Sequence, residues 1–139
     1  LVMIASDSVD IVHGKGHPRG AASFARVLGS YVRDKKILTL MDALRKVSLM
    51  PAQRMERSVP QMKKRGRLQK GMIADVTIFD AEKIADKASF LQANLPSDGI
   101  AHVIVSGHSI IKDYELLGNV FPGQAIRRSI PIETNAAGR

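Results

Sequence analysis

The sequence predicts an α+β chain in which a helical half precedes a strand half, and three observations carry this prediction. Residues 1–8 form an apolar run that ends near Asp7. Residues 21–36 repeat apolar side chains at the spacing of an amphipathic helix. Residues 74–80 alternate and are rich in residues that favour strands. With 139 residues, 45% of them hydrophobic, the chain can bury one modest core.

The opening apolar run predicts a buried strand with Asp7 at its C-terminal tip. A glycine-rich loop carrying His17 and Arg19 follows it. A strand end that presents a lone carboxylate beside such a loop is typical of α/β barrel enzymes. Leu1 lies inside the apolar run with no preceding cap or turn. We therefore expect the chain to begin at the last strand of a larger barrel and to be a fragment.

Two longer helices and a short one are predicted after this loop. In residues 21–36 the apolar face comprises Phe24, Val27, Leu28, Tyr31 and Val32. Thr39 is expected to cap the second helix, with Asp42 reaching back in a capping box. The buried stripe of that helix is Leu40, Ala43, Leu44 and Val47. Pro51 suits the first position of a third helix that runs to about residue 57.

The second half of the chain predicts strands at residues 74–80, 100–105 and 109–112. The last two form a hairpin through Ser106-Gly107-His108, where glycine allows the positive φ of a tight turn. Residues 85–93 are expected to be a short helical or irregular excursion. Asp75 and Asp80, which flank the first of these strands, are assigned turn and capping roles.

Charge and composition restrict the function classes. The net charge is +8, and much of it lies in one segment, formed by Lys63, Lys64, Arg65, Arg67 and Lys70. Because that segment has no aromatic residues to stack on bases, we expect a solvated connection and no nucleic-acid partner. No apolar run is long enough to predict a membrane span. The absence of cysteine favours a reducing, cytoplasmic location.

Several motifs, in order, resemble the C-terminal part of the metal-dependent amidohydrolase superfamily, most closely the N-acyl-D-amino-acid deacylases. The resemblance covers residues 1–128. It is carried by Ile4-Ala5-Ser6-Asp7-Ser8, His17-Pro18-Arg19, Phe24-Ala25-Arg26-Val27-Leu28-Gly29, Pro51-Ala52, Gly66-Arg67-Leu68 with Gly71, Ala74-Asp75, Phe79-Asp80, Val103-Ile104-Val105-Ser106-Gly107 and Pro122-Gly123.

This resemblance implies a parent enzyme built as a (β/α)₈ barrel with a composite β-sandwich and a divalent metal, usually zinc. Residues 1–60 would then be the end of the barrel, residues 61–127 part of the sandwich and residues 128–139 a flexible tail. Asp7 would be both a catalytic carboxylate and a metal ligand. Arg19 would grip the α-carboxylate of a small N-acyl amino acid, and His17 would orient the substrate-binding loop or contact Asp7.

The alternatives are plain structural roles. Asp7 could cap a turn after a buried strand, Arg19 could be a surface cation, and His17 could be an ordinary loop histidine. His13 and His17 do not predict a zinc helix, because the glycines and Pro18 around them exclude a helix there.

The family's other metal ligands would lie upstream of Leu1, so we expect the isolated chain to be inactive. Three other functions stay open: a dihydroorotase-like or hydantoinase-like cyclic amidase, a basic binding module at residues 61–71, and a structural domain without a ligand. Unpaired strand edges further predict self-association of the fragment.

Overall fold

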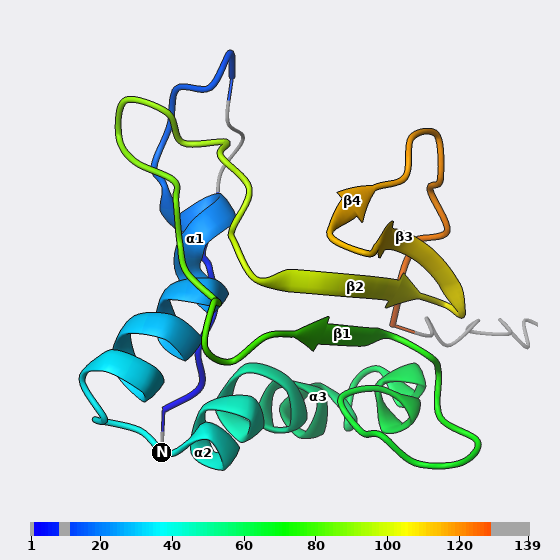
Figure 1. Cartoon of the computed structure of the whole chain (residues 1–139). Coiled ribbons are helices and arrows are strands. Elements are labelled where there is room, and N and C mark those ends of the chain that lie inside the picture. Colours follow the sequence, from blue (N-terminus) through cyan, green and yellow to red (C-terminus); the bar gives the residue numbers. More distant parts are fainter. Residues whose placement is uncertain (1, 9–11, 129–139) are drawn as a thin grey trace, which may run out of the picture.

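The computed structural model describes residues 2–8 and 12–128. Its helices precede a four-stranded antiparallel sheet in the chain, and the two parts lie side by side (Figure 1). The α+β order predicted from the sequence is therefore confirmed. The predicted flexible tail lies outside the described residues from residue 129 onward.

The first predicted helix is confirmed, with a different buried face from the one expected. Helix α1 (Arg19–Arg26) continues without a break into a π-helical segment, Val27–Asp34. Its buried residues are Ala22, Ala25, Val27, Leu28 and Gly29. Phe24 and Tyr31 are exposed instead. At Gly29 the helix approaches the backbone of Ile84 so closely that there is no room for a Cβ atom.

The second and third predicted helices form one continuous helical run. Helix α2 (Leu40–Leu44), a π-helical segment (Arg45–Leu49) and helix α3 (Met50–Met55) follow one another directly. Pro51 lies in the first turn of α3, as predicted, where its missing amide hydrogen costs little. The third helix differs from the expectation only in following the second without a gap. A short 3₁₀ turn, Pro60–Lys64, follows.

The sheet is a meander with the strand order β1-β2-β3-β4. Strands β1 (Val76–Phe79), β2 (Ile100–Val105) and β3 (His108–Lys112) confirm the three predicted strands. Ser106 and Gly107 have φ values of 50° and 83°, as a two-residue hairpin turn requires. Strand β4 (Glu115–Leu116) was not predicted, because two residues are too few to show an alternating pattern.

The two aspartates that flank β1 hold turns, as predicted. An oxygen of Asp75 accepts the amide hydrogen of Ser106 at 2.9 Å, which ties the hairpin turn to the start of β1. Asp80 accepts the amide hydrogen of Glu82 at 2.9 Å. This hydrogen bond, assisted by nearby Lys83, holds the pKa of Asp80 below its usual value.

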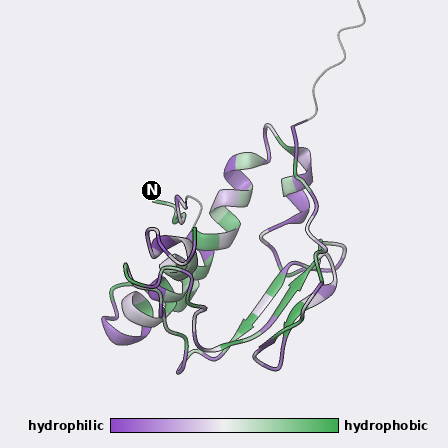
Figure 2. Cartoon of the chain, turned by 90° about the horizontal axis from the view of Figure 1, so that it is seen from above, coloured by the Kyte–Doolittle hydropathy of each residue, from purple (hydrophilic) through white to green (hydrophobic). Residues whose placement is uncertain are grey.

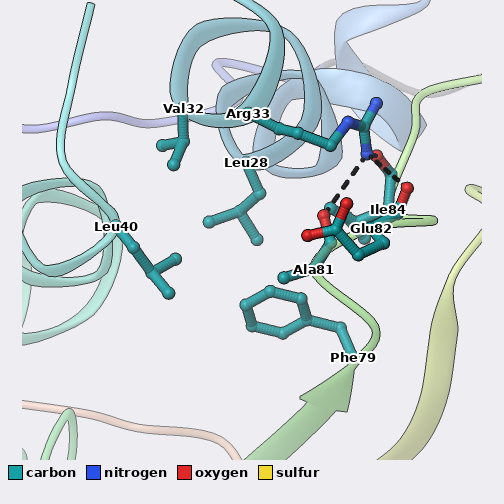
Figure 3. Close-up of a pocket in the computed structure, with 8 residues that line it drawn as sticks. All are labelled: Leu28, Val32, Arg33, Leu40, Phe79, Ala81, Glu82 and Ile84. Atoms are coloured by element: carbon teal, nitrogen blue, oxygen red, sulfur yellow. Dashed lines mark hydrogen bonds between the residues drawn. The ribbon is translucent and has the colours of Figure 1, made fainter. Parts of the chain in front are cut away.

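The core lies where α1, α2 and the loop after β1 meet. Its buried members are Ala25, Val27, Leu28, Ala43 and Ile84. Arg33 reaches across this junction and donates to the carbonyl oxygen of Ile84 at 2.6 Å, and more weakly to those of Ala81 and Glu82 (Figure 3). Figure 2 shows hydrophobic residues concentrated along the strands and on parts of the helices. The loop after β1 is thus fixed by both apolar packing and an arginine.

The opening strand predicted for residues 1–8 is wrong for this structure, in which residues 2–8 form no strand. A parallel barrel strand is stable only between neighbouring strands, and the described sheet uses strands from the other half of the chain. The segment instead lies along the second helical run, where the Ile4 amide donates to the carbonyl of Lys46 at 3.2 Å. No helix in the described parts of the chain is long and apolar enough to cross a membrane.

Candidate active site

Asp7 and Arg19, two of the predicted site residues, lie in direct contact. Asp7 Oδ2 is 3.1 Å from Arg19 Nη2. Asp7 has a φ of 47°, in the left-handed region that aspartate tolerates better than most residues. The side chain of Asp7 is 87% exposed and that of Arg19 is 37% exposed. Because Asp7 faces solvent, the pair adds little to stability, and an incoming anion can compete for the guanidinium.

Arg19 is held in place by the start of helix α1, since it is the first residue of that helix. Pro18 occupies the N-cap position and provides no side-chain hydrogen bond. His17 supplies the capping hydrogen bond instead, because its Nδ1 accepts the backbone N–H of Arg19 at 3.1 Å. The accepting Nδ1 leaves the proton of a neutral imidazole on Nε2. His17 therefore caps helix α1 through a hydrogen bond to the backbone of Arg19.

A loop from the sheet half of the chain, residues 85–98, packs against these site segments (Figure 1). The Ala93 amide donates to the carbonyl of Gly14 at 2.8 Å, and Ser97 Oγ donates to the carbonyl of Ala21 at 3.2 Å. Asp86 forms an ion pair with Arg26 at 3.0 Å. Sequence reasoning missed these residues, because nothing in their local pattern indicates a partner some 70 residues earlier.

A cavity of roughly 290 Å³ lies between this loop and the start of α1. It is bordered by His17, Arg19 and Arg26 on the helical side, and by Asp86 and Phe90 on the loop side. The ring of Phe90 stands edge-on to His17, with 5.0 Å between ring centroids. Cations at one wall of the cavity and one carboxylate beside it can bind a small anionic molecule.

The residues that the structure describes do not by themselves fit a metal ion. They contain no group of three histidine, cysteine, aspartate or glutamate side chains placed to share one. A catalytic zinc ordinarily takes three protein ligands, and here Asp7 supplies one carboxylate whose oxygen contacts an arginine. Any metal at Asp7 therefore requires donors from outside this set of residues.

Other polar side chains lie away from the Asp7–Arg19 contact. His102 is on β2, 3.7 Å from a carboxylate oxygen of Asp113 in the turn after β3. In the basic segment, Arg65 pairs with Asp75 and Arg67 pairs with Glu56, and all four side chains are partly buried. These two arginines therefore brace the fold, which weakens the case for a polyanion-binding module; the neighbouring lysines are exposed, as expected.

Comparison with known proteins identifies the segment. The chain is 40% identical over 116 residues to an N-acyl-D-glutamate deacylase of Alcaligenes xylosoxydans xylosoxydans, and the match covers 84% of this chain and 22% of the relative. It is 34% identical to a D-aminoacylase of the same organism, over 84% of this chain and 23% of the relative. The chain belongs to the amidohydrolase family. No family model matches it.

Solved amidohydrolase structures agree. The N-acyl-D-glutamate deacylase of Bordetella bronchiseptica, solved with zinc and a phosphonate mimic of the tetrahedral intermediate, superimposes with a TM-score of 0.69 at 38% identity, over 80% of this chain and 22% of the deacylase. A D-aminoacylase superimposes with a TM-score of 0.65 at 33% identity, over 73% and 20%. The chain spans about a fifth of the length of these amidohydrolases.

Proposed function

We propose that this chain is part of an enzyme that hydrolyses the amide bond of N-acyl-D-amino acids, and that Asp7 and Arg19 both act on the substrate. The support is the family membership together with the contact between these two side chains, 3.1 Å apart. A (β/α)₈ barrel with a composite sandwich is the parent architecture we propose, with residues 1–60 and 61–127 contributing to each part.

The substrate itself explains why a carboxylate and a guanidinium should be neighbours. In an N-acyl amino acid the amide nitrogen and the α-carboxylate are bonded to the same carbon atom. A group that binds the carboxylate and a group that serves the amide must therefore lie within a few ångströms of each other. Arg19 and Asp7 meet this condition, and Arg19 also lines the cavity at the start of α1.

Arg19 is proposed to bind the α-carboxylate of the substrate. A planar guanidinium can donate two parallel hydrogen bonds to one carboxylate, which fixes the orientation of the substrate as well as its position. The Asp7 contact engages Arg19 through Nη2. A substrate carboxylate can take over this contact and leave the carboxylate of Asp7 facing the scissile amide.

Asp7 is proposed to move the proton in the hydrolysis. A carboxylate near the amide can accept a proton from the attacking water and deliver it to the departing amine nitrogen. Relatives of this chain are metal enzymes, one solved with zinc. We propose that the whole enzyme also holds a divalent metal, zinc in the first instance, with Asp7 as one ligand and the other donors outside the described residues. We further expect a cytoplasmic location.

The experiment that tests this function uses the whole enzyme that contains this segment, loaded with zinc. Initial rates are measured on N-acetyl-D-glutamate, its L-enantiomer, neutral N-acetyl-D-amino acids and a cyclic amide such as dihydroorotate. We expect preference for the linear D-substrates. Asp7→Asn should lower kcat by roughly a hundredfold or more, whereas Asp113→Asn, which changes an exposed carboxylate in the turn after β3, should leave it unchanged.

Two outcomes would contradict the proposal. Preference for the cyclic amide would assign the enzyme to a different branch of the superfamily. An Asp7→Asn enzyme with the kcat of the unsubstituted protein would remove Asp7 from the reaction. The 139-residue chain assayed alone should hydrolyse none of these substrates, because it does not provide three metal donors in its described residues.

A further inference from the structure

Phe90 lies in an unusual place for a phenylalanine. Phe90 is 71% exposed and lies at the tip of the loop that follows β1. Ser89 and Gln92 close a tight turn around it, since each backbone amide donates to the other's carbonyl, at 3.1 Å and 3.2 Å. Phe90 and Leu91 are therefore the two central residues of a rigid turn.

The side chains of Phe90 and Leu91 have different surroundings. Leu91 is 94% exposed. Phe90 instead places its ring against the imidazole of His17 at an interplanar angle of 71°, an edge-to-face arrangement favoured between aromatic rings. The turn is held beside His17 by the next residues, because the amide of fully buried Ala93 bonds the carbonyl of Gly14. The loop thus places the Phe90 ring beside His17.

The contact continues through His17 to the proposed substrate-binding residue. His17 Nδ1 accepts the first backbone N–H of helix α1, that of Arg19. This hydrogen bond exists only when the imidazole is turned to point Nδ1 at the amide, and an exposed histidine has several other rotamers of similar energy. A ring packed against its face or edge removes some of that freedom.

From this geometry we propose that Phe90 is a positioning residue for Arg19, acting through His17: the Phe90 ring fixes the imidazole, the imidazole caps helix α1, and the cap fixes the start of the helix that carries the Arg19 side chain. The proposal rests on the proposed function only for the role of Arg19 in substrate binding. The relay from Phe90 to the Arg19 backbone is a property of this chain itself.

Substituting Phe90 should affect only the recognition of the α-carboxylate. Arg19 binds a group that keeps its charge through the reaction, so loosening it weakens substrate and transition state alike and raises KM with little change in kcat. Since one aromatic contact is lost, the expected rise in KM for N-acetyl-D-glutamate is about threefold to tenfold in Phe90→Ala. Phe90→Tyr keeps the aromatic edge and should restore the original KM.

The positioning role of Phe90 is tested by a structural measurement and a kinetic measurement. In the first, the ¹⁵N-labelled 139-residue chain is prepared as the unsubstituted form, Phe90→Ala, Phe90→Tyr and Leu91→Ala, and exchange of the Arg19 amide hydrogen with solvent is measured by NMR. Phe90→Ala should accelerate this exchange severalfold. Phe90→Tyr and Leu91→Ala should not, although Leu91 belongs to the same turn.

In the second measurement the whole enzyme carries the same substitutions, and kcat and KM are measured on N-acetyl-D-glutamate and on the corresponding N-acyl amine, which lacks the α-carboxylate. Phe90→Ala should raise KM for the first and leave kcat/KM for the second unchanged. Equal effects of Phe90→Ala and Leu91→Ala on KM would overturn the proposal. So would an exchange rate of the Arg19 amide hydrogen that Phe90→Ala leaves unchanged. If the unsubstituted enzyme has no deacylase activity, the proposed function fails, while the exchange measurement still decides the positioning role.

Discussion

Gly29 is the residue on which the junction between helix and loop depends most. A Cβ atom at this position would overlap the carbonyl oxygen of Ile84, the same oxygen that accepts the 2.6 Å hydrogen bond from Arg33. Backbone atoms cannot move aside as a flexible side chain can. The close approach therefore explains the glycine at position 29.

We predict that Gly29→Ala destabilises the 139-residue chain by about 2 kcal/mol, the size typical of forcing an extra carbon into a packed junction. The helix-forming preference of alanine acts in the opposite direction and reduces the net loss. Urea unfolding followed by circular dichroism measures the difference. Gly118→Ala is the matched control, because open space surrounds Gly118. Equal stability of the two variants would show that the junction is looser than the contacts indicate.

At the residue scale, the sequence predicted a site at Asp7, Arg19 and His17, and the structure places Asp7 and Arg19 in contact. A carboxylate after an apolar run and an arginine after His-Pro are visible as local patterns. The contact of His17 with Phe90 joins residues far apart in the chain, and a single phenylalanine between polar residues carries no signal of its partner. The position of Phe90 beside His17 could therefore be found only from the fold.

At the scale of elements, capping and turn chemistry were the most reliable guides. Thr39 is the N-cap of α2, and its Oγ1 accepts the amide hydrogen of Asp42 at 3.1 Å. The Asp42 carboxylate contacts the hydroxyl of Thr39 at 2.9 Å. The first interaction is local in sequence, which is why the pattern predicted it. The second departs from the predicted capping box, because Asp42 accepts from the Thr39 hydroxyl and not from the Thr39 backbone amide. The opening strand failed because its stability depends on neighbouring strands rather than on its own residues.

Thr39→Ala should therefore cost about 1 kcal/mol of stability, since it leaves an amide hydrogen at the start of α2 without its acceptor. Thr39→Ser keeps the hydroxyl and should lose much less. Thermal or urea unfolding of the two variants against the unsubstituted chain measures both values. A loss that is the same for alanine and serine would point to the missing methyl group, not to the cap.

At the scale of the whole chain, strand β1 is one of the two edge strands of the described sheet. It pairs with β2 on one side, and the described sheet provides no strand for its other side. Ile78 on this strand is 48% exposed. A free edge with apolar side chains is a template for pairing with another strand, whether from the rest of the enzyme or from a second copy.

We accordingly predict that the isolated 139-residue chain self-associates, with an apparent mass in analytical ultracentrifugation that rises with concentration. Ile78→Lys places a charge on the edge strand and should shift the chain toward monomer. Lys112→Met, which removes a charge from β3 instead, is the control and should not have this effect. A chain that stays monomeric at millimolar concentration would show that β1 is protected in another way.

In the proposed enzyme, Arg19 recognises the α-carboxylate next to the bond that is cleaved. The most direct measurement is the ratio of kcat/KM for N-acetyl-D-glutamate to kcat/KM for the N-acyl amine without that carboxylate, in the whole enzyme and its Arg19→Gln variant. We expect the ratio to fall roughly tenfold to a hundredfold in Arg19→Gln, the loss expected for a charge-assisted pair. It should stay constant in Arg54→Gln, an exposed arginine on α3. An Arg19→Gln enzyme that keeps the original ratio would contradict this role of Arg19.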